Sequence, residues 1–138
     1  MNKYTSLKSK HEAEINAFPF GFAFNKDQFD EMMTKWGFKP THRSQVMYLE
    51  GGCFIRKSDY NAMQEMFDRH EAERKEAMND DDYLFQMFNY ELANHEYSYT
   101  YDLADTLEAL GLTMKEINAD PRMADALKRA IAAQEEEN

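Results

Sequence analysis

The stretch from Tyr83 to Ala93 constrains the fold of this 138-residue chain more than any other. Eight of its eleven residues are apolar or aromatic, so a helix there carries apolar side chains on most of its surface. Such a helix must be covered on most sides by other elements. Asp80, Asp81 and Asp82 come directly before it, where an N-cap and negative charge stabilise a helix. We therefore predict a central helix over residues 82–96, surrounded by the rest of the chain.

The remaining segments predict further helices and a small antiparallel sheet. Residues 45–57 contain two β-rich runs joined by Gly51 and Gly52, which suits a hairpin turn whose central residues need positive φ. A short strand is predicted at residues 20–24, where aromatic residues alternate with small ones. Apolar spacing and caps predict further helices over residues 3–16, 26–36, 58–79 and 102–110, with Asn25 and Ser58 as the caps of the second and third. A capping box of Thr113 and Glu116 predicts a short helix, and a last helix is expected from Pro121 to a fraying tail that begins at Gln134. Residues 98–102 are expected to form a short connection after the central helix. The expected fold class is α+β and mainly helical, with the hairpin 45–57 and the strand 20–24 packed against about six helices.

Length and composition favour a single domain over residues 1–138. Within it, residues 1–57 form a helix, strand and hairpin part, and residues 58–138 form an acidic helical part. One cysteine, Cys53, excludes an internal disulfide. No apolar run reaches the roughly 20 residues of a membrane span, and the polar N-terminus does not resemble a signal peptide. We therefore expect a soluble, cytoplasmic protein.

Charge is distributed unevenly along the chain. The net charge is −10, with +3 on residues 1–57 and −13 on residues 58–138. The carboxylates expected to act together are Asp80, Asp81, Asp82, Asp102, Asp105 and Glu108. Held on rigid helices, such groups imitate a phosphate backbone and attract a basic nucleic-acid channel. This predicts a basic protein partner, such as a nuclease, and no direct binding to nucleic acid or to a membrane.

Catalytic motifs are missing from the sequence. It contains no GxGxxG, GxxxxGK[ST] or GxSxG, so we predict neither an enzyme nor a cofactor. Glu91 and His95 have i, i+4 spacing, with Glu96 adjacent and His70 as a further candidate ligand. A zinc site needs three or four converging ligands, so we predict no metal site and leave open whether His70 and His95 are structural. A small metal-dependent enzyme or metalloprotein centred on Glu91 and His95 remains the alternative.

Two features suggest nucleic-acid binding but rank lower. A small basic patch near Tyr48 and Trp36 is expected from Lys35, Lys39, Arg43, Arg56 and Lys57. Single-stranded RNA is recognised by aromatic side chains that stack on its bases. The net charge of −13 on residues 58–138, however, would repel a polyanion. Residues 103–129 imitate a helix-turn-helix, but DNA binding draws on Lys and Arg. Residues 101–138 carry nine acidic against four basic side chains, and the expected recognition helix offers one Lys and no Arg.

Three sequence phrases carry a resemblance to a known family: AFPFGFAFNKDQF, GGCFIRKSDY and YELANHEYSYTYDLADTLEALGLT. They resemble a family of small acidic proteins of unknown function carried by prophages and conjugative elements of gut Gram-positive bacteria. The resemblance implies no catalytic residues and a mobile-element setting, in which small acidic proteins often inhibit host defence nucleases. We therefore expect a non-enzymatic inhibitor of the anti-CRISPR or anti-restriction type, acting as a DNA mimic. An accessory protein-interaction subunit is a further alternative.

Overall fold

A computed structural model describes residues 2–136, and the chain divides into two compact units. Unit 1 comprises residues 1–11 and 72–138, and unit 2 comprises residues 12–71. The fold is α+β and mainly helical with a small antiparallel sheet, which confirms the predicted class. The boundaries between the units fall within helices α1 (Lys3–Ala17) and α3 (Tyr60–Ala77), not at residue 57, where the charge changes.

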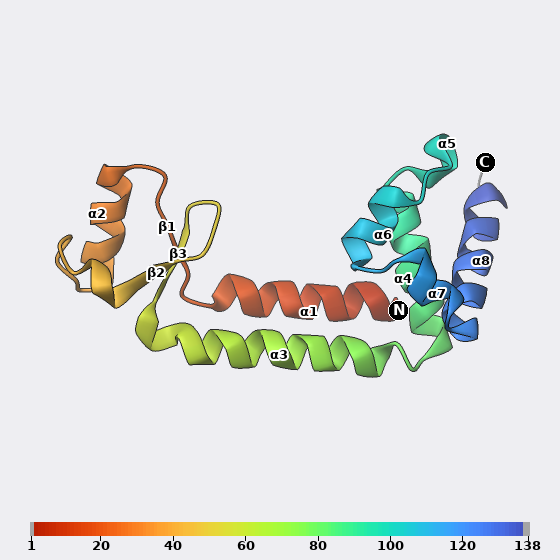
Figure 1. Cartoon of the computed structure of the whole chain (residues 1–138), viewed down its shortest axis with the longest axis horizontal. Helices are drawn as coiled ribbons and strands as arrows, with labels where there is room; N and C mark the ends of the chain where they lie inside the picture. Colours follow the sequence, from red (N-terminus) through yellow and green to blue (C-terminus); the bar gives the residue numbers. More distant parts are fainter. Residues whose placement is uncertain (1, 137–138) are drawn as a thin grey trace. The chain divides into compact units, whose positions relative to one another are not determined.

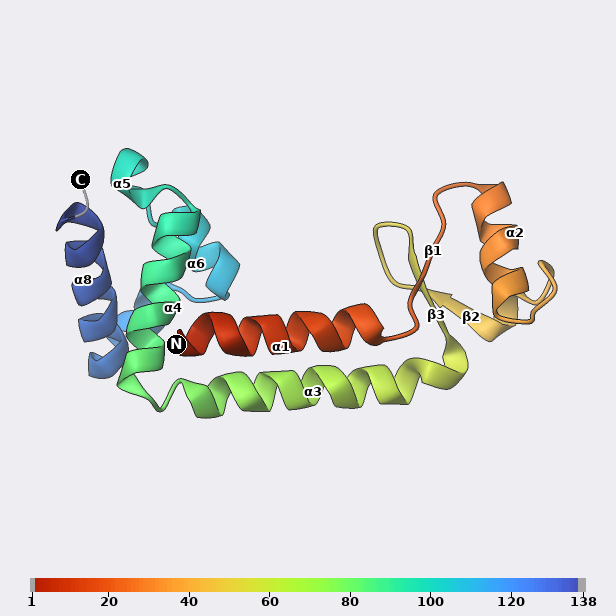
Figure 2. The same cartoon turned by 180° about the vertical axis from the view of Figure 1, so that it is seen from behind.

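Helix α4 (Asp81–Asn94) forms the centre of unit 1, as the sequence predicted. Phe88 and Leu92 on this helix are fully buried. The other helices that lie wholly in this unit are α5 (Tyr97–Thr100), α6 (Ala104–Leu110), α7 (Met114–Asn118) and α8 (Pro121–Glu136). Figures 1 and 2 show α4 between α6 and α8, and its most extensive contacts are with α8. The apolar stretch is therefore covered from several sides.

Local signals set the ends of these helices. The Asp80 side chain accepts hydrogen bonds from the backbone N–H groups of Asp82 and Tyr83 and so caps α4. Thr113 and Glu116 form the reciprocal capping box predicted for α7. Both predicted caps are confirmed. Each depends on residues only two or three positions apart, so the local sequence is sufficient to predict it.

Unit 2 contains the sheet, whose strands are β1 (Gly21–Phe22), β2 (Val46–Tyr48) and β3 (Cys53–Arg56), in the order β1-β3-β2. Gly51 and Gly52 both have positive φ, and the Cys53 N–H donates to the Glu50 carbonyl, which closes the predicted turn. Tyr48 and Gly21 both lie opposite Phe54, so their Cβ positions share one face of the sheet.

Helix α2 (Lys26–Lys35) packs against that face. A Cβ on Gly21 would lie 2.5 Å from the Met32 sulfur and 2.6 Å from the Trp36 ring, so this close approach requires glycine. Met32 and Met33 form a small core with Ala23 and Val46. Two 3-10 turns, η1 (Arg43–Gln45) and η2 (Lys57–Asp59), precede β2 and follow β3.

Three local expectations were wrong. Ser58 lies inside η2, so it is not the residue that begins the long helix α3 at Tyr60. Residues 97–100 form the short helix α5, whereas we expected a short connection over residues 98–102. Gln134 does not begin a fraying tail, because it is buried in α8 and its amide donates to the Asn89 side chain at 2.7 Å. The remainder of that predicted tail, residues 137–138, lies outside the described residues.

Membrane insertion by a helix finds no support in the described residues. None of the helices within residues 2–136 combines the length and the apolar character needed to cross a bilayer.

Candidate functional site

The six predicted acidic residues fall into two groups along α4. Asp80, Asp81 and Asp82 lie at its N-terminus. The second group is on or next to α6, whose Thr106 hydroxyl donates to the Glu91 carbonyl at 3.4 Å. Glu91 is ten residues beyond Asp81, which is about 15 Å along a helix axis. The structure therefore brings each group together but does not join the six residues into one cluster.

The first acidic group is paired with cations of unit 1. Lys3 Nζ lies 2.7 Å from Asp80 Oδ2 and 3.6 Å from Asp82 Oδ2. Arg122 Nη2 lies 2.6 Å from Asp81 Oδ1. The hydrogen bond from Lys3 lowers the pKa of Asp80, and the same contact raises the pKa of Lys3. These carboxylates have structural partners and offer little unbalanced charge to another protein.

The second acidic group has no such partners. Asp102, Asp105 and Glu108 are exposed and form no ion pair within residues 2–136. Asp102 accepts a hydrogen bond from the Ala104 N–H at 2.9 Å, which supports the start of α6. Thr106, which lies between Asp105 and Glu108 in the sequence, is fully buried. The two carboxylates are exposed, so they lie on the part of α6 that faces away from α4.

Exposed tyrosines lie directly before this acidic group in the sequence. Tyr99 is 81% exposed and Tyr101 is 62% exposed. Glu96 and Tyr101 adopt left-handed backbone conformations with φ of 56° and 54°. Such conformations cost about 1 kcal/mol or more each in a non-glycine residue, and they concentrate at functional sites. We call residues 96–110 the α5–α6 segment.

Glu91 is the centre of a separate, buried cluster. This residue is 2% exposed. Its Oε1 accepts hydrogen bonds from the Tyr4 hydroxyl at 3.1 Å and from Lys8 Nζ at 3.3 Å, and its Oε2 lies 3.4 Å from His95 Nε2. Burial, together with the Glu91 carboxylate, raises the pKa of Tyr4. The cluster is mainly an ion pair between the partly exposed Lys8 on α1 and the buried Glu91 on α4.

The candidate metal ligands converge only in part. Glu91 and His95 lie close together, as their spacing predicted, but in the described part of the chain neither belongs to a group of three candidate ligands. Glu96 is exposed at the end of α4. His70 lies in unit 2, buried on α3, with its Nε2 2.5 Å from Glu14 Oε2.

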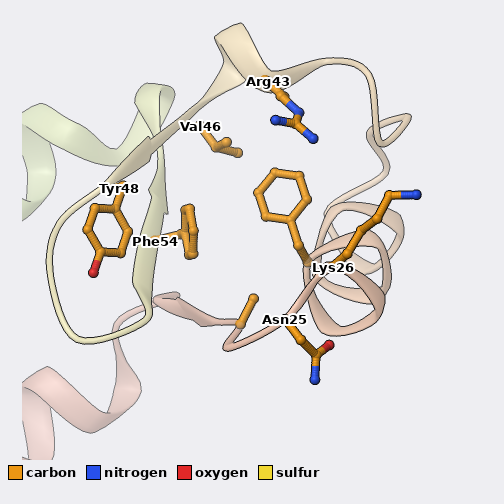
Figure 3. Close-up of a pocket in the computed structure, with 8 residues that line it drawn as sticks. Asn25, Lys26, Arg43, Val46, Tyr48 and Phe54 are labelled. Atoms are coloured by element: carbon orange, nitrogen blue, oxygen red, sulfur yellow. The ribbon is translucent and has the colours of Figure 1, made fainter.

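A pocket of about 460 Å³ lies in unit 2 between α2 and the sheet (Figure 3). Its lining consists of Ala23, Asn25, Lys26, Phe29, Arg43, Val46, Tyr48 and Phe54. The Phe54 ring centroid lies 5.4 Å from that of Phe29 and 5.1 Å from that of Tyr48. The pocket therefore has largely aromatic walls.

Two cations and no carboxylate line this pocket. The Arg43 guanidinium lies over the Phe29 ring, 5.6 Å from its centroid. Within residues 2–136, neither Arg43 nor Lys26 forms an ion pair or a side-chain hydrogen bond. An aromatic pocket with uncompensated positive charge suits a planar anion.

A family model matches residues 3–133, nearly the whole chain. The chain belongs to the family of unknown function DUF7659. No curated protein and no solved structure matches it. Membership in DUF7659 brings no activity, substrate or partner, so the function of this member has to be argued from its own residues.

The pocket of this DUF7659 member was only partly visible in the sequence. Arg43 and Tyr48 belonged to the predicted basic patch, and both line the pocket. The other cations of that patch do not; Arg56, for example, pairs with Asp59 at 2.7 Å. Lys26 and Phe54 were missed. The hairpin register was the available signal for Phe54, because it places this residue opposite Tyr48.

Proposed function

We propose that this DUF7659 member is a non-enzymatic binding protein that presents the α5–α6 segment to a basic surface of a protein partner. The observation that carries the proposal is the combination of unpaired carboxylates and exposed tyrosines on this segment. In its most specific form, the partner is a nucleic-acid-binding defence nuclease, and the protein is an inhibitor from a mobile element, of the anti-CRISPR or anti-restriction type.

The chemistry of the segment suits arginine and lysine side chains. A guanidinium binds a carboxylate through two parallel hydrogen bonds and also stacks on an aromatic ring. Tyrosine contributes strongly to protein interfaces because it buries a large, rigid area at a small entropic cost. Asp105, Glu108 and the neighbouring Tyr101 therefore offer both kinds of contact to the same basic surface.

The backbone of the segment supports the same interpretation. Tyr101 is exposed and yet adopts a left-handed conformation that glycine would adopt at lower cost. The Tyr101 ring packs edge-on against the buried Tyr97 ring, with the centroids 5.7 Å apart, and the residue is still 62% exposed. Partner binding would account for its presence.

Cleavage assays with purified restriction and RNA-guided nucleases test the proposal. The full-length protein is expected to inhibit at least one of these enzymes by competing with DNA, and inhibition should weaken as ionic strength rises. The triple variant D102N/D105N/E108Q should weaken inhibition at least about tenfold, because each lost charge pair contributes on the order of 1 kcal/mol. Asparagine at position 102 retains the acceptor for the Ala104 N–H.

A matched variant in unit 2 separates local contacts from net charge. D30N/E31Q/E50Q removes the same three charges from residues outside the α5–α6 segment. We expect inhibition to stay within about twofold of the wild type, because solvent and salt screen charges that make no contact with the partner. Equal losses in the two triple variants, or inhibition that ignores salt, would contradict the proposal. A panel in which no nuclease is inhibited would exclude the nuclease form.

One observation favours the alternative of a metalloprotein centred on Glu91 and His95. His95 Nε2 is buried without a hydrogen-bond partner among the described residues, and it lies 3.4 Å from Glu91 Oε2. Two ligand atoms at this separation fit a zinc ion with bond lengths of about 2.1 Å and a near-tetrahedral angle. Elemental analysis of the purified protein decides between the two functions. A stoichiometric metal that is lost in the His95→Ala variant would favour the metalloprotein.

A further inference from the structure

We infer that the pocket of unit 2 is a binding site for a mononucleotide, with the base against the aromatic walls and the phosphate on Arg43 and Lys26. This inference is independent of the function proposed above, because it concerns other residues in the other unit. Either one can fail without affecting the other.

The size and walls of the pocket suit a nucleobase. Its volume of about 460 Å³ falls within the range of small-molecule sites. Ala23 and Val46 are buried and supply an apolar floor, while the Phe29 and Phe54 rings are partly exposed. Every nucleobase has a flat π-face that stacks on such rings.

Tyr48 extends the aromatic wall toward solvent. This residue is 58% exposed although its ring lies beside Phe54, on the face of the sheet to which α2 packs. Figure 3 shows the Tyr48 and Phe54 rings next to one another on the sheet side of the pocket. A ring this exposed contributes little to the core and is available to a ligand.

The charges at the pocket suit a single phosphate group. Arg43 presents five N–H donors, and its one contact recorded within residues 2–136 is with the Phe29 ring. In Figure 3 its guanidinium points toward the pocket. The Lys26 ammonium points away from it, but the flexible four-carbon stem lies at the wall and allows the charge to turn toward a bound anion.

The net charge of the protein favours a free nucleotide over a nucleic-acid strand. Two cations neutralise one phosphate dianion, whereas the net charge of −10 repels a longer polyanion. An uncharged aromatic ligand would leave Arg43 without an ionic partner. The base and the phosphate are therefore both required, and a free mononucleotide supplies both with the least repulsion.

Titration of the full-length, isotopically labelled protein with AMP, followed by NMR, tests the inference. Adenosine and inorganic phosphate are the matched ligands, since each lacks one half of AMP. We expect AMP to shift amide signals of the pocket residues, and adenosine to bind at least about tenfold more weakly because it lacks the charge-assisted hydrogen bonds to Arg43. Titration with a single-stranded ten-nucleotide DNA shows whether the pocket binds a nucleotide within a strand more tightly than free AMP.

Two substitutions probe the two halves of the site. Tyr48→Ser should weaken AMP binding about fivefold or more through lost stacking, and Arg43→Gln about tenfold or more through the lost charge. Both residues are exposed, so the variants are expected to fold, which the NMR spectrum itself shows. Lys35→Gln, on α2, and Tyr60→Ser, on α3, are the matched controls, because both residues are exposed and lie outside the pocket lining. Each should change binding by less than about twofold.

Several results would overturn the inference. These are the absence of shifts at millimolar AMP, equal binding of adenosine and AMP, or losses of the same size in the control variants. Tighter binding of the ten-nucleotide strand than of AMP would overturn the assignment to a free nucleotide and indicate an unpaired nucleotide of a strand instead.

Discussion

The buried Glu91 cluster of unit 1 and the pocket of unit 2 arrange their charged groups in opposite ways. In unit 1 the buried carboxylate of Glu91 is matched by Lys8 and by the Tyr4 hydroxyl. In unit 2 the cations Lys26 and Arg43 line an aromatic pocket and pair with no carboxylate of the described chain. Charge that is satisfied internally stabilises a fold, whereas unsatisfied charge beside exposed rings is available to a ligand.

Net charge alone does not reveal this difference. Unit 1 carries a formal charge of −7 and unit 2 carries −3, so both are acidic. Within unit 2, however, residues 18–58 hold six basic and four acidic side chains, and the pocket lies in this part. The arrangement of the charges therefore matters more than their sum.

The cores of the two units differ as well. The core of unit 1 is built around α4 and includes Leu84, Phe88 and Leu92. The core between α2 and the sheet is smaller, and Phe22 and Phe24 in this unit are exposed. A small core leaves aromatic rings exposed to solvent, where a ligand can contact them.

The largest expected effect comes from Phe88→Ala, which removes a fully buried ring from the core of unit 1. We expect it to lower the free energy of unfolding by about 3–5 kcal/mol. Denaturant titration followed by far-UV circular dichroism measures the loss. Fluorescence of Trp36, the single tryptophan, reports on unit 2 in the same titration. Because the two core clusters share no residue, the shift should be smaller in the fluorescence signal, and equal shifts would show that the units unfold together.

Glu91→Gln tests the contrast between the paired charges of the buried cluster and the unpaired charges of the pocket. This change keeps the size of the side chain but leaves the Lys8 ammonium without its counter-ion, at an expected cost of about 1–3 kcal/mol. Glu96→Gln is the matched control, because Glu96 is exposed and unpaired within the described residues, and it should cost less than about 0.5 kcal/mol. Thermal denaturation at neutral pH compares the two variants. Similar losses in both would mean that the buried cluster does not stabilise unit 1.

Helix caps offer a symmetrical comparison of the units. Thr113 caps α7 in unit 1, and Asn25 caps α2 in unit 2 through a hydrogen bond to the Gln28 N–H. Thr113→Ala and Asn25→Ala should each cost about 1 kcal/mol, whereas Thr113→Ser and Asn25→Asp should be nearly neutral. Chemical denaturation of the four variants measures these changes. An alanine variant with an unchanged free energy of unfolding would show that the corresponding cap does not stabilise the fold.

Acid denaturation gives the smallest expected effect. The hydrogen bond from Lys3 lowers the pKa of Asp80 in unit 1, and the hydrogen bond to His70 lowers the pKa of Glu14 in unit 2. A carboxyl group with a lowered folded-state pKa stabilises the protein above its unfolded pKa of about 4, and this contribution is lost as the pH falls through the folded-state pKa. Asp80→Asn and Glu14→Gln should each flatten the fall in stability below about pH 4. Urea unfolding at pH 3 to 7 measures the slopes, and slopes unchanged from the wild type would refute the assignment.

The candidate sites could be predicted from the sequence only in part. Six acidic residues were predicted to act together, but Lys3 and Arg122 pair with three of them, and neither cation was linked to those residues by any sequence pattern. Of the residues that line the pocket, only Arg43 and Tyr48 had been placed at a candidate site by the sequence. Lys26 and Phe54 complete it through the packing of α2 on the sheet, which no local pattern encodes.

Local sequence was sufficient for the main elements of this protein: the central helix after Asp80, the capping box at Thr113, the cap at Asn25 and the turn at Gly51 and Gly52. Each of these is completed within about four residues, so its energy is contained in a short stretch of chain. The pairing of charges was settled by long-range packing. Lys8 meets Glu91 across 83 residues, and Arg122 meets Asp81 across 41. Such contacts form only after the helices have packed around α4, because the position of each partner is set by the burial of apolar surface and not by its own sequence neighbours.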